Sequence, residues 1–295
     1  MKHTGVIHID DAEKYESLPV CSRKTLKSFG WYGGKLRKLD FILPLLPECD
    51  HYVEPFGGSA AVLLNRKPSK IETYNDIYGE VVNFFRVLRD HPDELKKVVD
   101  LTPYSREEYF YACYEQGETD IERARKFLIR VYMAWMSLAQ TAEIGNWKVT
   151  IDSTFITSIK WDYASKDFYE VSKRVKRVQL ENRPAIDIIE KYDRIGTLFY
   201  CDPPYLMETR TSGKGYAYEM NNDQYVEFAT VVNTCKGKVA ISGYDHPFLD
   251  ELFPPPKWRK VYDKERFSSS TRGKGKRTDV LWMNYDIDAI KSSLL

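Results

Sequence analysis

The apolar run 198–200 and one cysteine are followed directly by an acidic residue, two prolines and a tyrosine. These four residues are Asp202, Pro203, Pro204 and Tyr205. Each proline fixes φ at about −65° and removes a backbone donor, so the segment predicts a rigid rim at the end of a strand. In α/β proteins, ligands bind at the carboxyl ends of parallel strands. This rim therefore predicts a binding site.

The chemistry that suits this rim is transfer of a group to an amino nitrogen on an aromatic ring. Such a nitrogen is a poor nucleophile because its lone pair is delocalised into the ring. Hydrogen bonds from its N–H groups to the Asp202 carboxylate and the Pro203 carbonyl would favour a tetrahedral nitrogen aimed at an electrophile. The Tyr205 ring would stack on the base. We therefore predict Asp202, Pro203 and Tyr205 as catalytic residues; the plain alternative is a stiff turn that ends a strand.

Two further features predict a cofactor with a ribose near this rim. Gly57 and Gly58 lie between a strand pattern and a helix pattern, where glycine lets backbone approach a ligand, but they lack the full G-x-G-x-x-G spacing. Asp76 ends the next predicted strand, where an acid can accept both hydroxyls of a ribose. A tight turn and a helix N-cap are the structural alternatives. NAD and S-adenosylmethionine fit equally well, but hydride transfer has no use for the Asp202 rim.

The elements that must position these residues follow an α/β pattern. We predict strands at 52–53, 71–76, 178–182, 198–202, 238–244, 259–262 and 280–285. A helix follows the second strand, and its apolar face includes Val81, Phe84 and Leu88. No strand pattern with β-α-β spacing occurs between 77 and 175, which predicts a helical insertion. The last two strands flank a polar loop, which is typical of an antiparallel hairpin.

The composition excludes several other classes. The 295 residues are 43% hydrophobic and 29% charged, which suits one large domain or a domain with an insertion. No apolar stretch is long enough to span a membrane and no signal peptide is recognisable, so we expect a cytoplasmic protein with no membrane partner. The five cysteines are widely spaced and odd in number, which indicates neither a disulfide framework nor a zinc site, and we expect no metal.

One loop carries the local positive charge that binding of nucleic acid requires. The formal net charge of the chain is only +1, but the loop at 266–277 holds five basic residues and no acid: Arg266, Arg272, Lys274, Lys276 and Arg277. Arginine and lysine neutralise phosphates, and the interspersed hydroxyls donate hydrogen bonds. We predict that this loop contacts DNA, against the alternative of a solvated surface. The basic residues at 123–130 and Lys148 either follow phosphates or form a solvated helical face.

In the order and spacing of these motifs, the chain resembles the D12 class of DNA adenine N6-methyltransferases, the Dam-like group. The resemblance covers 29–285 and rests on four segments, followed by the basic loop. These segments are FGWYGGK at Phe29–Lys35, EPFGGS at Glu54–Ser59, YNDI at Tyr74–Ile77 and DPPY at Asp202–Tyr205.

The resemblance implies transfer of a methyl group from S-adenosylmethionine to N6 of a flipped-out adenine in duplex DNA. It implies a Rossmann-like methyltransferase sheet, mostly parallel with an antiparallel C-terminal hairpin, and a helical insertion. The implied cofactor contacts are Trp31, Lys35, Phe56, Gly57, Asp76 and Asp202. Asn182, at the end of the third strand, is a candidate partner for the cofactor's adenine. Because the target amino group is buried in a duplex, the base must flip, and Tyr216 and Tyr218 are candidates for filling the void.

The expected organisation is a variable leader at 1–28, a catalytic S-adenosylmethionine-binding domain at 29–94 and 171–295, and a helical target-recognition insertion at 95–170. Around Trp135–Thr150 the chain lacks the Asn-Gly-rich text of the Dam-like group, so recognition of GATC is not assumed. Three alternatives stay open: methylation of N4 of cytosine, a catalytically inactive DNA-binding protein of the same fold, and a nicotinamide oxidoreductase. We expect a monomer or weak dimer, with double-stranded DNA and a cognate restriction endonuclease as candidate partners.

Overall fold

The computed structural model describes residues 6–7, 25–135, 146–149, 157–210, 217–263 and 278–286. Most of the predicted leader lies outside these ranges. So do Tyr216 and the whole basic loop with Arg266, Arg272, Lys274, Lys276 and Arg277. Among the helices described, none is long and apolar enough to cross a membrane.

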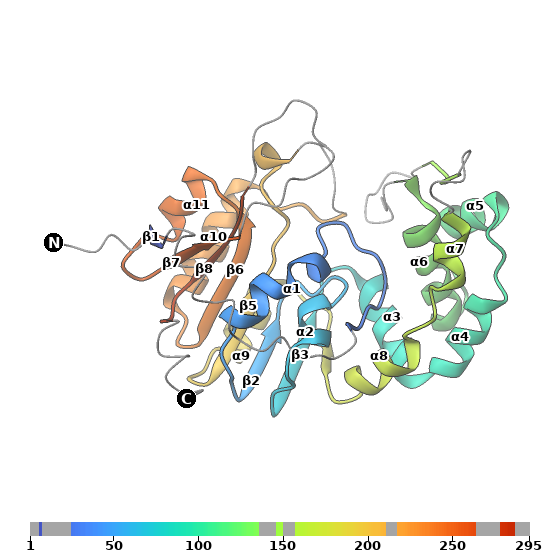
Figure 1. The fold of residues 1–295 in the computed structure, drawn as a ribbon, viewed down its shortest axis with the longest axis horizontal. Coiled ribbons are helices and arrows are strands. Elements are labelled where there is room, and N and C mark those ends of the chain that lie inside the picture. The colour runs from blue at the N-terminus through green and yellow to red at the C-terminus, as the bar shows by residue number, and fades with distance from the viewer. Residues whose placement is uncertain are drawn as a thin grey trace.

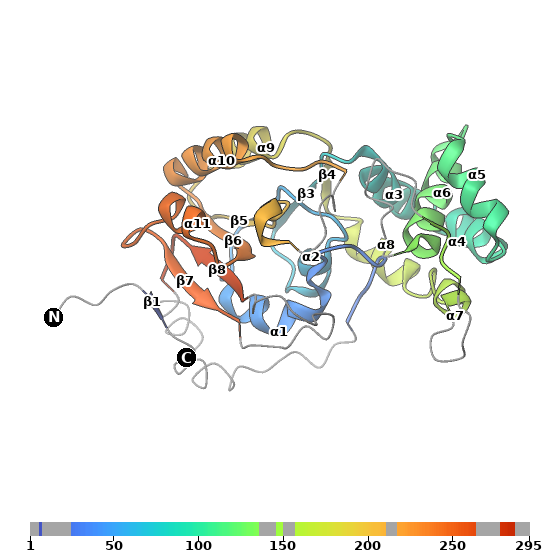
Figure 2. The same cartoon turned by 90° about the horizontal axis from the view of Figure 1, so that it is seen from above.

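One mixed sheet organises the described part of the chain, with its strands in the order β1-β7-β8-β6-β5-β2-β3-β4 (Figures 1 and 2). The strands are β1 (Val6–Ile7), β2 (His51–Glu54), β3 (Ile71–Asn75), β4 (Gln179–Glu181), β5 (Thr197–Cys201), β6 (Lys238–Tyr244), β7 (Arg259–Tyr262) and β8 (Asp279–Met283). All strands from β2 to β6 pair in parallel. The predicted fold class, a mostly parallel sheet with antiparallel C-terminal strands, is confirmed.

The C-terminal strands pair in an arrangement that the sequence did not specify. β7 and β8 are antiparallel, with Arg259 opposite Met283. β8 also pairs with β6, so it lies between β6 and β7 rather than at the edge. The two-residue strand β1 continues the sheet beyond β7. It is too short to show a periodic pattern, which is why the sequence did not predict it.

Helices cover both faces of the sheet, and each face has its own apolar core. Strand β5 illustrates the alternation: Leu198 and Tyr200 enter one core, while Phe199 and Cys201 enter the other. The first core contains α1 (Leu39–Ile42), α2 (Ala61–Asn65) and α3 (Gly79–Asp90), and the second α9 (Ala185–Tyr192), α10 (Asn222–Thr234) and α11 (Pro247–Leu252). Because β5 is buried on both faces, it reads as a continuous apolar run.

A group of helices between α3 and β4 lies beside the sheet (Figure 1, green). These are α4 (Pro92–Asp100), α5 (Arg106–Tyr114), α6 (Asp120–Met133), α7 (Thr157–Asp162) and α8 (Phe168–Val175). The group is anchored through α6, where the Phe127 ring lies 5.2 Å from that of Phe29 and 5.8 Å from that of Phe84. The insertion therefore shares a core with the segment that begins at Phe29.

The basic residues of α6 hold the insertion together. Arg123 pairs with Glu80 at 2.6 Å, and Arg125 pairs with Glu108 at 2.8 Å. Lys126 is only 1% exposed, and its ammonium lies 3.8 Å from the centroid of the Tyr111 ring. Arg130 donates to the Ala112 carbonyl. Contacts within the protein thus withdraw Arg125, Lys126 and Arg130 largely from solvent, whereas the ion-paired Arg123 side chain is 37% exposed.

Candidate active site

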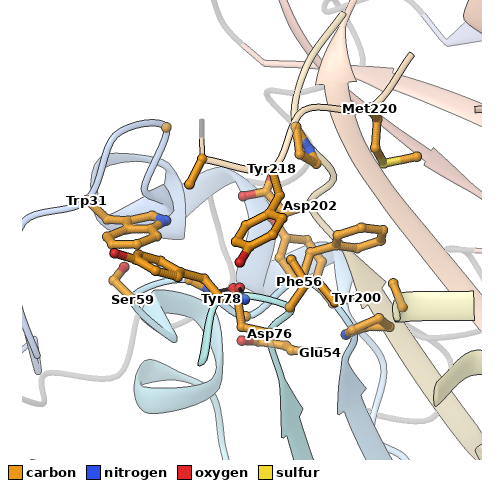
Figure 3. A pocket seen from close by; sticks show the side chains of 18 of the residues that line it. Trp31, Glu54, Phe56, Ser59, Asp76, Tyr78, Tyr200, Asp202, Tyr218 and Met220 are labelled. Carbon is orange, nitrogen blue, oxygen red and sulfur yellow. Dashed lines mark hydrogen bonds between the residues drawn. The ribbon is translucent and has the colours of Figure 1, made fainter. Parts of the chain in front are cut away.

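A cavity of about 690 Å³ opens at the carboxyl ends of β2, β3 and β5 (Figure 3). Three of its acidic residues stand at the ends of those strands: Glu54 ends β2, Asp76 follows β3 and Asp202 follows β5. Strand β2 lies between β3 and β5, so the chain crosses to opposite sides of β2, and such switch points are where open α/β sheets bind ligands. Trp31, Lys35, Phe56 and Gly57 also line the cavity. The fold thus brings six predicted site residues to one place.

The glycines after β2 are required by the side chains that pack on them. A Cβ on Gly57 would lie 2.1 Å from the Tyr74 ring, and a Cβ on Gly58 would lie 2.6 Å from Nε1 of Trp31. Gly58 also has a φ of +47°, in the left-handed region. The Tyr74 hydroxyl donates to the Gly58 carbonyl at 2.7 Å. Close packing therefore explains these glycines, in addition to the predicted approach of backbone to a ligand.

The carboxylate of Asp76 organises the turn after β3. Its Oδ2 accepts from the Gly58 amide and its Oδ1 from the Tyr78 amide, both at 2.8 Å. Burial raises the pKa of Asp76 to about 6, although these two amide hydrogen bonds oppose the shift. Each oxygen keeps acceptor capacity toward the cavity that Asp76 lines.

Asn182 lies behind this turn and is absent from the cavity lining. Its amide group donates to the carbonyls of Asp76 at 2.7 Å and Ile77 at 3.1 Å. The first three residues of α9 and the one before them, 184–187, line that side of the cavity instead. In this position Asn182 stabilises the turn that carries Asp76, and it does not line the cavity in which we predicted a contact with a cofactor adenine.

Asp202 has a separate partner for each carboxylate oxygen. Lys35 Nζ lies 2.6 Å from Oδ2, and the Ser242 hydroxyl donates to Oδ1 at 2.7 Å. The same ammonium donates to the Gly33 carbonyl at 2.7 Å. Burial raises the pKa of Asp202, while Lys35 and Ser242 oppose that rise. The side chain is 19% exposed, so it remains accessible from the cavity.

The other two predicted catalytic residues lie one layer behind the cavity. Tyr205 is 7% exposed, and its ring meets that of Tyr244 edge to face at 4.7 Å between centroids. Pro203 is buried. Neither residue belongs to the cavity lining, whereas Pro204 does, and its carbonyl accepts from the Tyr225 hydroxyl at 2.7 Å. The ammonium of Lys35 covers the Tyr205 ring at 4.8 Å from its centroid.

Several site residues were not singled out from the sequence. Glu54 is 2% exposed, and burial raises its pKa to about 8 against hydrogen bonds from the Tyr52 hydroxyl and the Leu63 amide. Tyr78 lines the cavity beside Tyr218, with 5.9 Å between their ring centroids. Ser242 had a signal that could have been read, because it is a polar residue that directly follows the apolar run 239–241 within a predicted strand.

Comparisons with known proteins identify the family. Residues 31–268 match the family model described as D12 class N6 adenine-specific DNA methyltransferase. The match covers the insertion and all four motif segments in part or in full, and the chain belongs to this family. The protein is therefore an adenine-specific DNA methyltransferase by family, and methyltransferase activity implies use of S-adenosylmethionine.

A curated relative supports the same class. The chain is similar to the type II methyltransferase M1.LlaDCHI of Lactococcus lactis subsp. cremoris, with 25% identity over 289 residues, 86% of this chain and 94% of the relative. Among solved structures, a conserved hypothetical protein of Streptococcus pyogenes matches with a TM-score of 0.35 and 11% identity over 85% of this chain and 96% of its own. The rRNA methyltransferase AviRa of Streptomyces viridochromogenes matches with a TM-score of 0.37 and 10% identity over 98% of both chains.

Proposed function

We propose that S-adenosylmethionine binds in the cavity between Trp31 and Asp202 and that a flipped adenine enters beside Asp202. The observation that carries the proposal is the presence of Asp76 and Asp202 on one cavity, at the ends of β3 and β5. Its volume of about 690 Å³ lies within the range of roughly 300–1,000 Å³ that is typical of small-molecule sites.

The residues present suit each part of the cofactor. The Asp76 carboxylate can accept hydrogen bonds from the ribose hydroxyls, since its backbone contacts use only part of its acceptor capacity. Among the lining residues that the structure describes, Lys35 is the cation that can pair with the cofactor carboxylate. Trp31 and Phe56 contribute apolar surface on the lining. The bound cofactor supplies a methyl group on a sulfonium, which is an excellent leaving group.

Asp202 is the residue that positions the nucleophile. Its Oδ2 accepts a hydrogen bond from the amino group of the target adenine and directs the nitrogen lone pair toward the methyl carbon. As the new N–C bond forms, the C–S bond breaks with its electron pair on sulfur, and a proton leaves the nitrogen for the carboxylate or water. Orientation supplies most of the catalysis, because the leaving group needs no further activation.

Lys35 must release the oxygen that the substrate needs. Its ammonium now makes the two contacts that we assign to the target base, one to Asp202 and one to the Tyr205 ring. A cofactor carboxylate in the same cavity offers Lys35 another anionic partner. We infer that cofactor binding draws Lys35 away from Asp202 before the adenine enters, which also uncovers the face of Tyr205 for stacking.

Duplex DNA is the substrate that the family implies, and we propose that the basic loop at 266–277 contacts its phosphates. The proposal rests on the composition of the loop, because its residues lie outside those described. The name of the lactococcal relative supports a role in a restriction–modification system with a cognate endonuclease.

Incubation of the purified protein with methyl-labelled S-adenosylmethionine and unmethylated duplex DNA tests the proposal. Digestion of the product to nucleosides should give labelled 6-methyladenine, and Asp202→Ala should give none. Labelled 4-methylcytosine alone would instead indicate a cytosine methyltransferase. Binding of DNA without cofactor binding or methyl incorporation would indicate an inactive member of the family. Binding of NAD in place of S-adenosylmethionine would overturn the cofactor assignment.

A further inference from the structure

Ser242 touches the catalytic carboxylate from the neighbouring strand. It lies in β6, where Ile241 pairs with Cys201 of β5, so the next residues of the two strands, Ser242 and Asp202, adjoin. The Ser242 hydroxyl donates to Oδ1 of Asp202 at 2.7 Å. The Tyr200 hydroxyl in turn donates to Ser242 Oγ at 3.2 Å. A buried chain of two hydroxyls therefore ends on the carboxylate.

These contacts divide the carboxylate into a fixed side and an exchangeable side. The terminal torsion of aspartate is broad and nearly two-fold, so a carboxylate without fixed partners presents either oxygen in many rotations. Ser242 is 5% exposed and sits in the sheet, so its contact with Oδ1 cannot easily be given up. Lys35 contacts Oδ2 from a 3-10 turn (Lys35–Lys38) at the cavity, where another donor can replace it.

We propose that Ser242 is a positioning residue for methyl transfer, which holds the Asp202 carboxylate in the rotation that presents Oδ2 to the target amino group. This inference rests on the proposed role of Asp202. Tyr200 supports it by donating to Ser242 Oγ, and the Ser242 hydroxyl contacts Oδ1 at 2.7 Å, much closer than its other acceptor, the Cys201 carbonyl at 3.5 Å. A preoriented acceptor lowers the barrier because it needs no reorganisation during the reaction.

A purely structural reading of Ser242 makes a different prediction. Its neighbours in β6, Val239, Ala240 and Ile241, are apolar and buried. A buried hydroxyl needs a hydrogen-bond partner, and Asp202 would then serve only that need. Under this reading, replacing Ser242 changes stability alone. Under our proposal, it changes the catalytic step and its dependence on pH.

The dependence on pH follows from the groups that face Asp202. Lys35 and the Ser242 hydroxyl lower its pKa, and burial and Asp279 raise it. Asp202 also interacts electrostatically with Glu54, Tyr200 and Tyr225. Removal of the Ser242 hydroxyl deletes one of the groups that favour the carboxylate. The acidic limb of the rate profile should therefore move to higher pH.

The test compares Ser242→Ala, Ser242→Thr and Tyr200→Phe in methyl transfer to duplex DNA. Ser242→Ala should lower kcat on the order of 10–100-fold, by analogy with loss of the residues that orient metal ligands. The KM for S-adenosylmethionine should stay unchanged, and the acidic limb should move to higher pH. Ser242→Thr, which keeps the hydroxyl, should restore kcat and the pH profile. Tyr200→Phe should have a smaller effect of the same kind.

Thr197→Val is the matched control, because it removes a buried hydroxyl from the far end of β5, where Thr197 donates to the Tyr192 carbonyl. It should lower the melting temperature without changing kcat. Wild-type kcat and pH profile in Ser242→Ala, with Asp202→Ala inactive, would overturn the role of Ser242 alone. Substantial activity in Asp202→Ala would overturn the proposed function itself. If Ser242→Ala does not fold, wild-type kinetics in Tyr200→Phe would overturn the inference.

Discussion

The ammonium of Lys35 lies 2.6 Å from Oδ2 of Asp202 and 4.8 Å from the centroid of the Tyr205 ring. We propose that these two groups bind the amino nitrogen and the ring of a target adenine. Lys35 would then occupy the contacts that the substrate needs. We therefore predict that cofactor binding and base entry are linked, because Lys35 must exchange Asp202 for the cofactor carboxylate before the base enters.

Lys35→Met should weaken binding of S-adenosylmethionine by about tenfold or more, since charged hydrogen bonds contribute roughly 1.5–3 kcal/mol. Calorimetric titration with the cofactor measures the change. Lys38→Met is the matched control, because Lys38 lies on the same 3-10 turn but pairs with Asp263 and Asp279. Equal cofactor affinities for wild type and Lys35→Met would contradict the assigned partner.

Asp202→Ala should lower the rate of methyl transfer by at least about a hundredfold, the scale for loss of one preorganised transition-state contact. Because Asp202 lies on the rim of the cavity, outside both apolar cores, the variant should fold and keep a cooperative thermal transition. Single-turnover assays and thermal unfolding measure the two properties. Substantial residual transfer in a folded variant would rule out the mechanism.

Affinity for S-adenosylmethionine should fall as the pH drops through about 6. The raised pKa of Asp76, about 6, means that the carboxylate takes up a proton there and loses capacity to accept hydrogen bonds from the ribose. Affinity should therefore be highest above this pH and decline below it. Titrations between pH 5 and 8 measure the profile. The Asp76→Asn variant should bind S-adenosylmethionine more weakly, and its affinity should not fall near pH 6. An unchanged fall in affinity in that variant would assign the titration to another group.

The Glu54→Gln variant should gain folding stability relative to the wild type as the pH rises from about 4.5 to 8. Burial raises the pKa of Glu54 from 4.5 to about 8, so folding favours the protonated acid. The stability it contributes is full below the unfolded pKa and is lost as the pH rises through the folded pKa. Glutamine does not titrate. The difference in melting temperature between variant and wild type should grow over this interval, and a constant difference would contradict the shifted pKa.

Lys276→Ala and Arg277→Ala should each weaken binding to duplex DNA by a similar factor for every sequence. Loss of one phosphate contact should reduce the slope of log affinity against log salt by about 1. Fluorescence titrations at several salt concentrations measure both effects. Lys173→Ala, an exposed residue of α8 paired with Glu170, is the control. Selective loss of binding to one sequence would instead indicate a base contact.

Local patterns in the sequence predicted the strands β2 to β8 and the positions of the motifs. The predicted spans 238–244 and 259–262 coincide with β6 and β7. The polarity of each residue along a strand reflects whether its side chain is buried, so alternation and apolar runs mark strands locally. The DPPY segment predicted a rim from local sequence as well, because proline restricts its own backbone wherever it occurs. The family was recognisable at this level because its motifs are short and continuous.

Only the tertiary structure decided which groups meet. Lys35 and Asp202 are 167 residues apart in the chain, and Ser242 and Asp202 are 40 apart, so no local pattern could report either contact. The position of β8 between β6 and β7 and the burial of Lys126 in α6 likewise depend on residues that are distant in the sequence. Side chains from distant segments pair when the packing of the sheet and helices brings them together and excludes water. That packing brings Lys35 and Ser242 to the two oxygens of Asp202.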